Sequence, residues 1–442
     1  MSLTIAQQND FKKLEIERNI CPKFIPLNIP VVTKNNYFAT GTEIITANCQ
    51  HKLACDIKVG DKLMGSDGNC SIVKKVVMSQ DKMYEIIPNK GEKYIVNGDF
   101  VLSLKASNYE MINWDENRNR YRVRWLQNYT IREKTFALST YGRSSGSKSM
   151  SKNAVKRNVH LFCTRYLRDI KKQPGYIGYG DIIEIKVKDY MTMKPRIRAA
   201  FKGFSAGIKF KERPIDVDPY ILGYWLGDGA SKAPEITTAE KEIVQYFTKY
   251  AQKNGLVLKK YGKYRYGITT GIINDKLGSN FFLNFLKKYH IWGNKHIPID
   301  YIKNSKKNRL KLLAGLIDSD GHNSNNTYDF VFKSEILADN VIFLARSLGF
   351  KAFKKKVKKT YTNSSRGRVT GTYYRFCIHG EGLEKIPSLL KRKRTHTRET
   401  KKNAAVTAIK IKEVDKADHY GFVLDRKEKI LLKDFTVVQC CN

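Results

Sequence analysis

The sequence predicts a multidomain α+β protein in which an all-β domain accompanies a mixed domain built on two similar helices. The length of 442 residues is enough for about two or three domains. From Tyr37 onward, short runs of β-branched residues alternate with Gly, Asn and Asp, which is typical of strands joined by turns. The mixed domain is predicted from two apolar segments, 221–229 and 313–321, that both end in Asp-Gly.

The two apolar segments carry small or acidic residues at matching positions. Aligned on Asp-Gly, the matching pairs are Gly223 with Gly315, Gly227 with Ser319 and Asp228 with Asp320. Helices with small residues four apart on one face can approach closely, so both carboxylates would emerge at one end of the pair. Two such carboxylates suit a hard cation such as Mg²⁺, and the backbone carbonyls of Gly227 and Ser319 would add oxygen ligands. The alternative is two ordinary core helices that stop at Asp-Gly.

The second segment carries a family resemblance. Its sequence, Leu-Ala-Gly-Leu-Ile-Asp-Ser-Asp-Gly, resembles the signature of the LAGLIDADG homing endonucleases, and residues 220–231 are similar to the first motif of the intein-type members. The resemblance implies a pseudo-twofold αββαββ endonuclease domain. It also implies Mg²⁺-dependent hydrolysis of double-stranded DNA at a long, asymmetric site by a monomer.

The charge of the chain also indicates a nucleic-acid partner. Lys and Arg total 81 against 42 Asp and Glu, a formal net charge of +39, and such an excess is costly unless a polyanion neutralises it. Residues 351–400 carry 15 basic and 3 acidic residues with Tyr and Phe between them, as expected of a DNA-facing sheet. A basic scaffold protein, or a solvated basic face, remains the alternative.

The cysteines and the hydropathy of the chain indicate in which cellular compartment the protein is expected. The eight cysteines show no CxxC spacing, which predicts neither a zinc site nor a disulfide framework. The sequence holds no run of about 18 apolar residues, so no membrane span is predicted. We expect a nuclear protein in a eukaryote and otherwise a cytoplasmic protein with access to DNA. The runs 354–359 and 391–394 fit either nuclear localisation or DNA contact.

The β-rich segments extend the resemblance. Residues 37–42 and 56–61 resemble the start of an intein (Hint) domain, and 419–441 resemble its C-terminal end. A nuclease between two Hint halves is the layout of the VMA-type intein and HO endonuclease family. The domains expected on this basis are an N-terminal arm at 1–36, a first Hint part at 37–104, an inserted DNA-recognition region at 105–180, a Hint strand and linker at 181–205, the endonuclease domain at 206–402 and a C-terminal Hint part at 403–442.

The same resemblance predicts that splicing is lost. Carried over residue by residue, Tyr37 stands at the nucleophile, Phe100 at the assisting His, Gln439 at the penultimate His and Cys440 at the terminal Asn. A phenol is a poor acyl-shift nucleophile, Phe transfers no proton, and Cys forms no succinimide. In an alternative register the intein ends at Gln439, whose side chain can cyclise as the terminal Asn would, so one of the four positions regains a suitable residue. We expect a free-standing endonuclease with an inactive Hint domain, and the alternatives are a working intein or a DNA-binding regulator that does not cleave.

The resemblance also assigns site residues. Asp228 and Asp320 match the catalytic carboxylates, whereas Asp318 aligns with Leu226 and is expected to be structural. Lys295, before Ile-Pro, and Lys393, with Lys391 as the alternative, match the basic residues beside the carboxylates. The DNA contacts expected in the inserted region are Arg120, Arg122, Arg124 and Arg132. Those expected in the second half of the endonuclease domain are Lys354, Lys356, Lys358 and Arg375.

Overall fold

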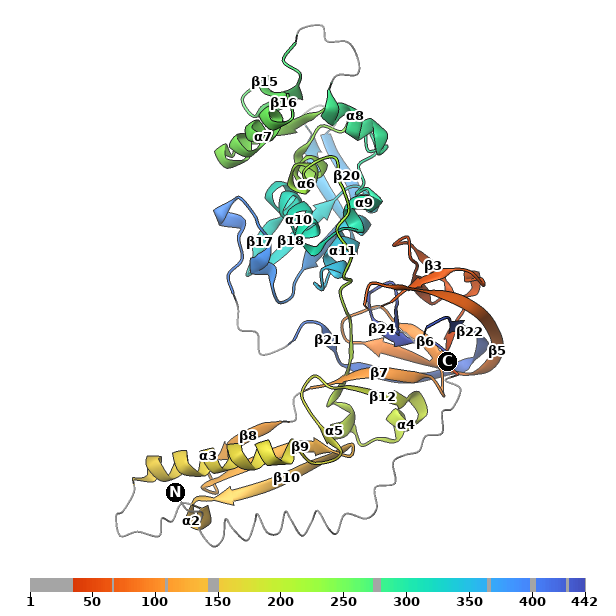
Figure 1. Ribbon diagram of the computed structural model, residues 1–442, viewed down its shortest axis with the longest axis vertical. Coiled ribbons are helices and arrows are strands. Elements are labelled where there is room, and N and C mark those ends of the chain that lie inside the picture. Colours follow the sequence, from red (N-terminus) through yellow and green to blue (C-terminus); the bar gives the residue numbers. More distant parts are fainter. Residues whose placement is uncertain are drawn as a thin grey trace.

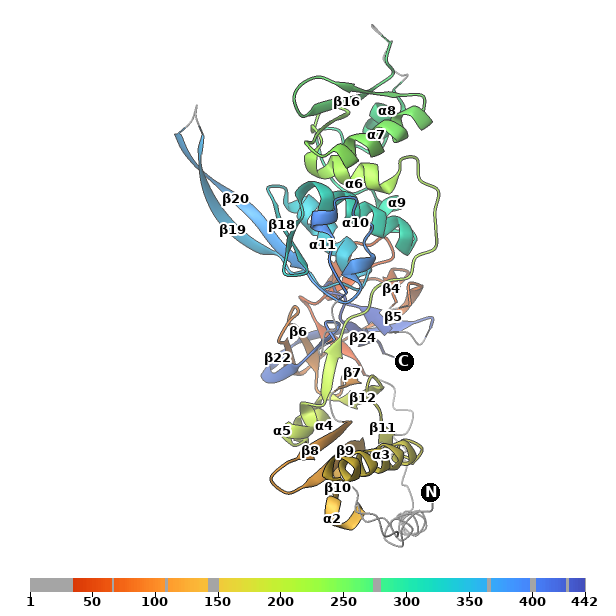
Figure 2. The same cartoon turned by 90° about the vertical axis from the view of Figure 1, so that its left-hand side faces the viewer.

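The computed structural model describes residues 35–65, 67–107, 110–141, 151–272, 280–363, 367–397, 403–426 and 429–441. Three bodies follow one another along the long axis of the molecule (Figures 1 and 2). A mixed αβ body lies at one end, an all-β body lies in the middle, and a small αβ module lies at the other end. Among the described helices, none is long and apolar enough to cross a membrane.

The all-β body is built from chain segments on both sides of the mixed body in sequence. Its strands are β1 (Tyr37–Ala39), β2 (Glu43–Ile45), β3 (His51–Leu53), β4 (Lys62–Met64), β5 (Cys70–Pro88), β6 (Tyr94–Asn97), β7 (Val101–Ala106), β12 (Ile182–Lys186), β13 (Phe201–Phe204), β21 (Val406–Thr407), β22 (Ile409–Leu424), β23 (Lys429–Leu431) and β24 (Val437–Gln439). Short helices are η1 (Ala54–Asp56), α4 (Val187–Thr192) and α5 (Pro195–Arg198).

A long antiparallel ribbon of β5 and β22 holds the two ends of this body together. It pairs residues from Ile409↔Pro88 to Leu424↔Val73. The sheet order β22-β1-β6-β5-β4 places the first strand between β22 and β6. A second sheet has the order β12-β7-β13-β21. Burial of Phe38, Phe100 and Phe422 between these layers stabilises the arrangement.

The small module interrupts the all-β body between the neighbouring strands β7 and β12, which pair with each other. Its elements are β8 (Met111–Asp115), β9 (Arg120–Gln127), β10 (Thr130–Ala137), α2 (Leu138–Tyr141), α3 (Lys152–Ile170) and β11 (Tyr176–Ile177). Tyr121, Val123 and Trp125 alternate along β9 and are buried in a separate apolar cluster with residues of α3. The module therefore has a core of its own.

Helix α3 begins inside a stretch that the sequence suggests is a loop. Residues 142–156 are rich in Ser, Gly and Lys, and residues 142–150 lie outside the described part of the chain. From Lys152 onward the loop prediction is wrong. Ser151 caps the helix, since its hydroxyl accepts a hydrogen bond from the backbone N–H of Ala154.

The mixed body contains two successive halves. The first consists of α6 (Pro219–Asp228), β14 (Glu235–Thr237), α7 (Lys241–Lys253), β15 (Val257–Lys260), β16 (Arg265–Thr269), α8 (Phe281–Lys288) and α9 (Ile299–Ile302). The second consists of α10 (Lys306–Asp320), β17 (His322–Ser324), β18 (Thr327–Phe332), α11 (Glu335–Ser347), β19 (Lys355–Asn363) and β20 (Gly367–Ile378), followed by η2 (Leu383–Lys385) and η3 (Lys391–Lys393).

The two halves resemble each other in element order but differ in detail. The second half runs α-β-β-α-β-β, and its described sheet has the order β17-β18-β20-β19. The described sheet of the first half has the order β14-β16-β15, and an isolated bridge between Gly229 and Ile236 stands where the second half has β17. The predicted αββαββ order is thus present in the second half. The twofold relation between the halves stays a prediction.

Two basic residues fasten the mixed body to the all-β body. Arg309 is 1% exposed and donates hydrogen bonds to the carbonyl oxygens of Ile208 at 2.7 Å and Ser347 at 2.7 Å. Lys303, which is half-buried, donates from Nζ to the carbonyl oxygen of Ala47 at 2.8 Å. Because a charge as deeply buried as that of Arg309 is tolerated only when it is well hydrogen-bonded, these contacts fix the junction.

Candidate functional site

Helices α6 and α10 touch through their backbones at the seam between the two halves. A Cβ on Gly223 would lie 2.2 Å from the carbonyl oxygen of Leu312, and a Cβ on Gly315 would lie 2.2 Å from that of Tyr220. A Cβ on Gly227 would lie 2.0 Å from Ser319 Oγ. The small residues that match in the sequence are therefore the ones that face each other in the seam, and no larger side chain fits without moving a helix.

The same contact brings the two carboxylates together. Asp228 is the last residue of α6 and Asp320 is the last residue of α10, so both lie at the C-terminal end of the helix pair. Burial, together with the Asp228 charge, raises the pKa of Asp320 to about 6. Burial also raises the pKa of Asp228, against the attraction of Lys393 and Lys295. Negative charge at a helix C-terminus is further disfavoured by the helix dipole.

The carboxyl end of α6 is capped by Lys295. Its Nζ donates hydrogen bonds to the carbonyl oxygens of Gly227 at 3.1 Å and Gly229 at 2.6 Å. The ammonium also lies 5.1 Å from the centre of the Trp225 ring, a cation–π contact. Burial lowers the pKa of Lys295 to about 8, although Asp320 and Asp228 favour its charged form.

Lys393 makes the corresponding contacts at the end of α10. Its Nζ donates to three carbonyl oxygens, those of Ile317 at 2.8 Å, Asp318 at 2.8 Å and Ser319 at 2.9 Å. The residue is 7% exposed, and burial lowers its pKa. Each motif helix therefore ends with one carboxylate and one lysine. The alternative, Lys391, is exposed and has no such contact in the described structure.

Asp318 holds the segment that carries Lys393. It is 3% exposed and accepts hydrogen bonds from Tyr220 Oη at 2.7 Å, Ser388 Oγ at 2.5 Å and the backbone N–H of Leu389 at 2.7 Å. It therefore connects α6, α10 and the segment before η3, in the structural role expected from the sequence. Ser388 and Tyr220 were not predicted, because a contact between residues 70 or more positions apart leaves no local sequence signal.

The donor set fits a divalent cation. Two carboxylates and nearby backbone carbonyls are hard oxygen donors, and Mg²⁺ commonly takes one or two carboxylates and fills its remaining positions with water and phosphate oxygens. The carbonyls of Gly227 and Ser319 already accept a hydrogen bond from a lysine, and each keeps a second lone pair. Among the described residues, no group of three or more His, Cys, Asp or Glu forms a denser metal site.

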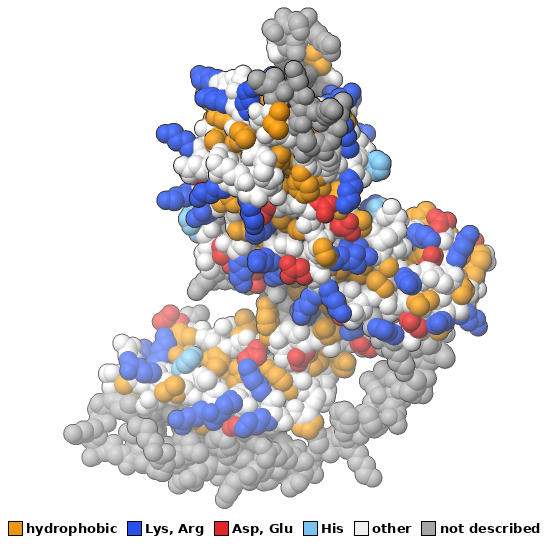
Figure 3. Space-filling view, turned by 45° about the horizontal axis from the view of Figure 1, so that its top comes forward, with side chains coloured by type: hydrophobic (Ala, Val, Ile, Leu, Met, Phe, Trp, Pro, Cys, Tyr) orange, Lys and Arg blue, Asp and Glu red, His pale blue; other side chains and the backbone are white. Residues whose placement is uncertain are grey.

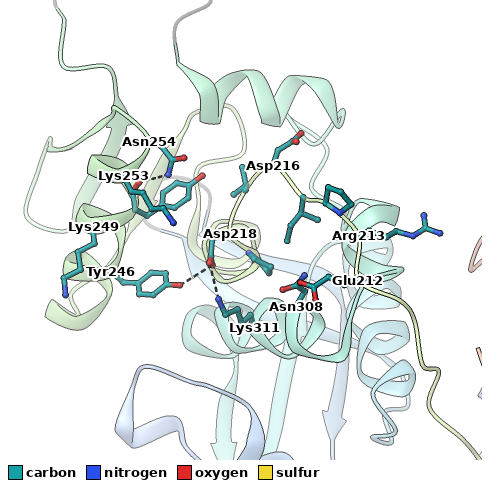
Figure 4. Close-up of a pocket in the computed structure, with 15 residues that line it drawn as sticks. Glu212, Arg213, Asp216, Asp218, Tyr246, Lys249, Lys253, Asn254, Asn308 and Lys311 are labelled. Atoms are coloured by element: carbon teal, nitrogen blue, oxygen red, sulfur yellow. Dashed lines mark hydrogen bonds and ion pairs between the residues drawn. The ribbon is translucent and has the colours of Figure 1, made fainter.

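A cavity of about 590 Å³ lies at the opposite end of α6 (Figure 4). Asp218, the N-cap residue of α6, points into it and accepts hydrogen bonds from Tyr246 Oη at 3.3 Å and Lys311 Nζ at 3.5 Å. Because Asp228 is at the other end of the same helix, this cavity is separate from the carboxylate pair.

The arginines predicted to contact DNA in the small module lie largely in ion pairs. Arg122 is 2.9 Å from Asp115, Arg124 is 2.5 Å from Glu133, and Arg120 is 3.6 Å from Asp115. Arg132 is exposed on β10. These pairs compete with any phosphate for the three arginines of β9, which the sequence pattern could not reveal.

Helix α3 offers a freer basic surface on the same module. Arg157, Arg165 and Arg168 are exposed along one face of the helix, and no acidic side chain pairs with them in the described part of the chain. Spacings of eight and three residues place them within one stripe. This stripe was not predicted from the sequence.

The alternation of side chains along each strand shows on which face of the sheet the basic residues of the second half lie. Phe330, Phe332 and Phe376 are in the core, so the even-numbered side chains of β18 and β20 face α11. In the β19–β20 pairing, Lys356 and Lys358 lie opposite Tyr374 and Thr372, on this helix side. Arg375 and Lys355 lie opposite each other on the other side. Lys356 and Lys358 are therefore not on the outer face of the sheet.

The hairpin β19–β20 nevertheless projects beyond α11, so both of its sides are open there (Figure 2). Lys354 lies within 2.7 Å of both Glu335 and Asp339, and Arg375 lies 3.1 Å from Asp329. In the first half, Lys259 and Arg265 lie on the outer face of the smaller sheet, by the same alternation. Lys and Arg side chains are spread over the face of the molecule seen in Figure 3.

The four positions where splicing groups are absent come together in the all-β body. Tyr37 pairs with Gly421 in β22, and its ring centre is 4.7 Å from that of His419. Phe100 is buried against Phe38 with ring centres 5.1 Å apart. Gln439 and Cys440 are buried at the end of β24. Phe100 thus puts an apolar ring at the position of the assisting His, and His419 is the titratable ring beside Tyr37.

Comparison with known proteins follows this geometry. Residues 37–439 match the family described as Hom_end-associated Hint. The chain belongs to the Hom_end-associated Hint family. This confirms the family resemblance seen in the sequence, and it relates the protein to the homing and HO-type endonucleases.

Relatives of this Hom_end-associated Hint protein include two curated proteins. The homothallic switching endonuclease of Saccharomyces cerevisiae is 22% identical over 444 residues, covering 79% of this chain and 72% of the relative. The replicative DNA helicase DnaB of Mycobacterium intracellulare is 33% identical over 158 residues, which is 36% of this chain and only 22% of the helicase.

Similar solved structures match single parts of the chain. Mesophilic variants of the homing endonuclease I-DmoI are 16% identical, with a TM-score of 0.25, over 37% of this chain and 87% of theirs. The gp41-1 intein is 18% identical, with a TM-score of 0.15, over 18% of this chain and 69% of its own.

We predict that Asp320→Asn raises thermal stability in metal-free buffer near neutral pH. The folded pKa of about 6 exceeds the ordinary value of 3.8, so folding favours the neutral carboxyl. The stability this provides is complete below about pH 4 and is lost as pH rises through about 6, a cost on the order of 3 kcal/mol. Melting curves with a chelator at about pH 4 and about pH 7.5 measure it. If Asp320→Asn does not raise the melting temperature near pH 7.5, or raises it equally at both pH values, the pKa of Asp320 is not raised as described. The exposed Asp415→Asn serves as the control.

Proposed function

We propose that this protein is a site-specific endonuclease that hydrolyses double-stranded DNA with a divalent cation, Mg²⁺ by preference. The observation that carries the proposal is the pair of buried carboxylates, Asp228 and Asp320, joined at one helix seam and accompanied by Lys295 and Lys393. Membership in the Hom_end-associated Hint family and similarity to the homothallic switching endonuclease of yeast support it.

Each group has a role that its environment allows. Asp228 and Asp320 would hold a cation beside the DNA backbone, and burial raises the pKa values of both carboxyls in its absence. When bound, the cation would supply an activated water and stabilise the leaving oxygen. Lys295, with a pKa of about 8, can hold or release a proton near neutral pH, and Lys393 adds positive charge at the other helix end.

Three surfaces would bind the DNA. Two of them would be the outer faces of the two sheets, one in each half, which supply Lys259, Arg265, Lys355 and Arg375. The arginine stripe of α3 lies at the far end of the molecule and would grip flanking duplex (Figure 1). Because the halves are unlike and the module is attached on one side only, a long asymmetric site and a monomeric enzyme are proposed. A nuclear location would follow in a eukaryote.

We predict that Asp228→Asn and Asp320→Asn each abolish cleavage while DNA binding persists. Either change removes a cation ligand, whereas the basic surfaces stay intact. The substrate is duplex recovered by binding from a random-sequence library, and cleavage is scored on a gel with Mg²⁺ and with a chelator. Asp415→Asn, at an exposed position of β22 where its pairing with β5 is irregular, is the matched control. Full cleavage by both site variants would refute the assignment.

We predict that the arginine stripe adds affinity outside the cut site. Changing Arg157, Arg165 and Arg168 to Ala should weaken binding and reduce the slope of log affinity against log salt by roughly three, about one per lost phosphate contact. Arg122→Ala with Arg124→Ala is the comparison, because those side chains are ion-paired. An unchanged salt slope in the triple variant would contradict the role of the stripe. A larger loss of DNA affinity in the double variant would instead support the β9 arginines, which the sequence first predicted as the DNA contacts.

We also propose that the Hint domain does not splice. Tyr37 and Phe100 lack the required nucleophile and proton donor, and Cys440 cannot cyclise. With residues 37–439 placed in frame inside a reporter protein, the precursor should stay intact and no ligated reporter should form. Ligated reporter detected by mass spectrometry, with the insert released, would overturn this conclusion.

A further inference from the structure

The cavity at the N-terminal end of α6 takes no part in the proposed DNA cleavage (Figure 4). Three parts of the chain line it, which are residues 212–219, one side of α7 and the beginning of α10. Its volume of about 590 Å³ falls within the range of about 300–1,000 Å³ that small-molecule sites occupy. Asp218 lies at this end of α6 and Asp228 at the other, so the cavity can hold a ligand of its own.

Helix α7 brings aromatic and basic side chains to the cavity. Those that line it are spaced three or four residues apart on one side of the helix, and are Tyr246, Lys249, Tyr250 and Lys253. Pro214 and Ile215, in the segment before α6, add apolar surface. Both tyrosines are half-buried, so a planar ring in the cavity could cover the aromatic surface that they leave open.

The inner acidic side chains of the cavity already have partners. Lys288 Nζ donates a hydrogen bond to Asp216 at 2.7 Å. Asp218 accepts hydrogen bonds from Tyr246 Oη at 3.3 Å and from Lys311 Nζ at 3.5 Å. These two carboxylates therefore leave little negative charge to attract a cationic ligand.

The basic side chains at the rim have no such partners. Within the described part of the chain, no ion pair holds Arg213, Lys249 or Lys253, and all three residues are exposed. Glu212 is the one acidic residue of the described lining that is also unpaired. Three free positive charges against one free negative charge favour an anionic ligand.

Two polar groups of the cavity are left for a ligand to satisfy. Tyr250 Oη is shielded from water and has no hydrogen-bond partner among the described residues, which is costly for a hydroxyl. Burial and the Asp218 charge raise the pKa of this phenol, so it stays a donor at neutral pH. Asn308 Nδ2 donates to Asn304 at 2.8 Å, which leaves Asn308 Oδ1 to accept from the N–H of a ligand.

We propose that this cavity binds a nucleoside phosphate. The base packs against the rings of Tyr246 and Tyr250, one of its N–H groups donates to Asn308 Oδ1, and a ligand oxygen accepts from Tyr250 Oη. The phosphate groups bind Lys249 and Lys253 at the rim. Because neither the carboxylate pair nor the outer faces of the sheets take part, this site is independent of the proposed DNA cleavage.

The test is calorimetric titration of the full chain with ADP, GDP, CDP and UDP. A chelator is present, so that no metal links a nucleotide to Asp228 or Asp320, and salt of about 0.15 M screens weak binding to the rest of this basic surface. At least one nucleotide should bind saturably, with one site per chain. Its affinity should exceed those of its nucleoside and of inorganic phosphate by about tenfold or more, since each of these lacks part of the recognised group.

Variants of the lining separate specific binding from general charge attraction. Lys249→Ala with Lys253→Ala should weaken nucleotide binding about tenfold or more, because both ammonium groups at the phosphate are lost. Tyr250→Phe should weaken it about fivefold or more through loss of one hydrogen bond. Lys74→Ala with Lys75→Ala, at exposed positions of β5, removes the same charge outside the cavity and should leave the affinity unchanged. Melting temperatures show that the variants fold.

Two results would overturn the proposal. One is that no nucleotide binds more tightly than inorganic phosphate, and the other is that the two lysine pairs lose equal affinity. The double variant Asp228→Asn, Asp320→Asn should keep its nucleotide binding, so this result does not depend on whether the protein cleaves DNA.

Discussion

The backbone contact between α6 and α10 is the constraint on which the rest of the candidate site depends. Gly223 and Gly315 let the helices meet at atomic contact, which no other residue would allow without a shift. Because both helices end at the same place, the charge of Asp228 in one half helps to raise the pKa of Asp320 in the other. Each lysine then caps the carbonyls of one helix, which offsets part of the negative charge collected there. The seam therefore makes one site from two helix ends.

The all-β body provides a frame that holds the other two. Its β5–β22 ribbon joins chain segments from either side of the mixed body, so the mixed body is anchored at both of its ends. Buried Arg309 and half-buried Lys303 reinforce the junction by donating to backbone carbonyls. The small module leaves from the β7–β12 connection, where an insertion costs little. The whole chain carries a net charge of +39, a self-repulsion that a bound polyanion would relieve.

Much of the site could be predicted because its signals are local in sequence. The Asp-Gly register gave the facing glycines and both carboxylates, and Lys295 stood beside a recognisable Ile-Pro. The choice of Lys393 over Lys391 rested on resemblance alone, and the structure brings Lys393 to the end of α10. What could not be predicted depends on distant partners. Ser388 contacts Asp318 across 70 residues, and the ion pair of Arg124 with Glu133 follows from the register of β9 on β10. Lys356 and Lys358 lie on the helix side because α11 covers one particular face, which strand alternation alone does not identify.

The central claim, that the seam forms a single cation site from Asp228 and Asp320, can be tested without knowing the DNA target. Trp225 lies beside the site, so a bound Tb³⁺ ion should emit when tryptophan is excited. The account predicts a saturable Tb³⁺ signal that Mg²⁺ displaces, and that is lost both in Trp225→Phe and in the double variant Asp228→Asn, Asp320→Asn. A signal of full strength in the double aspartate variant would contradict it.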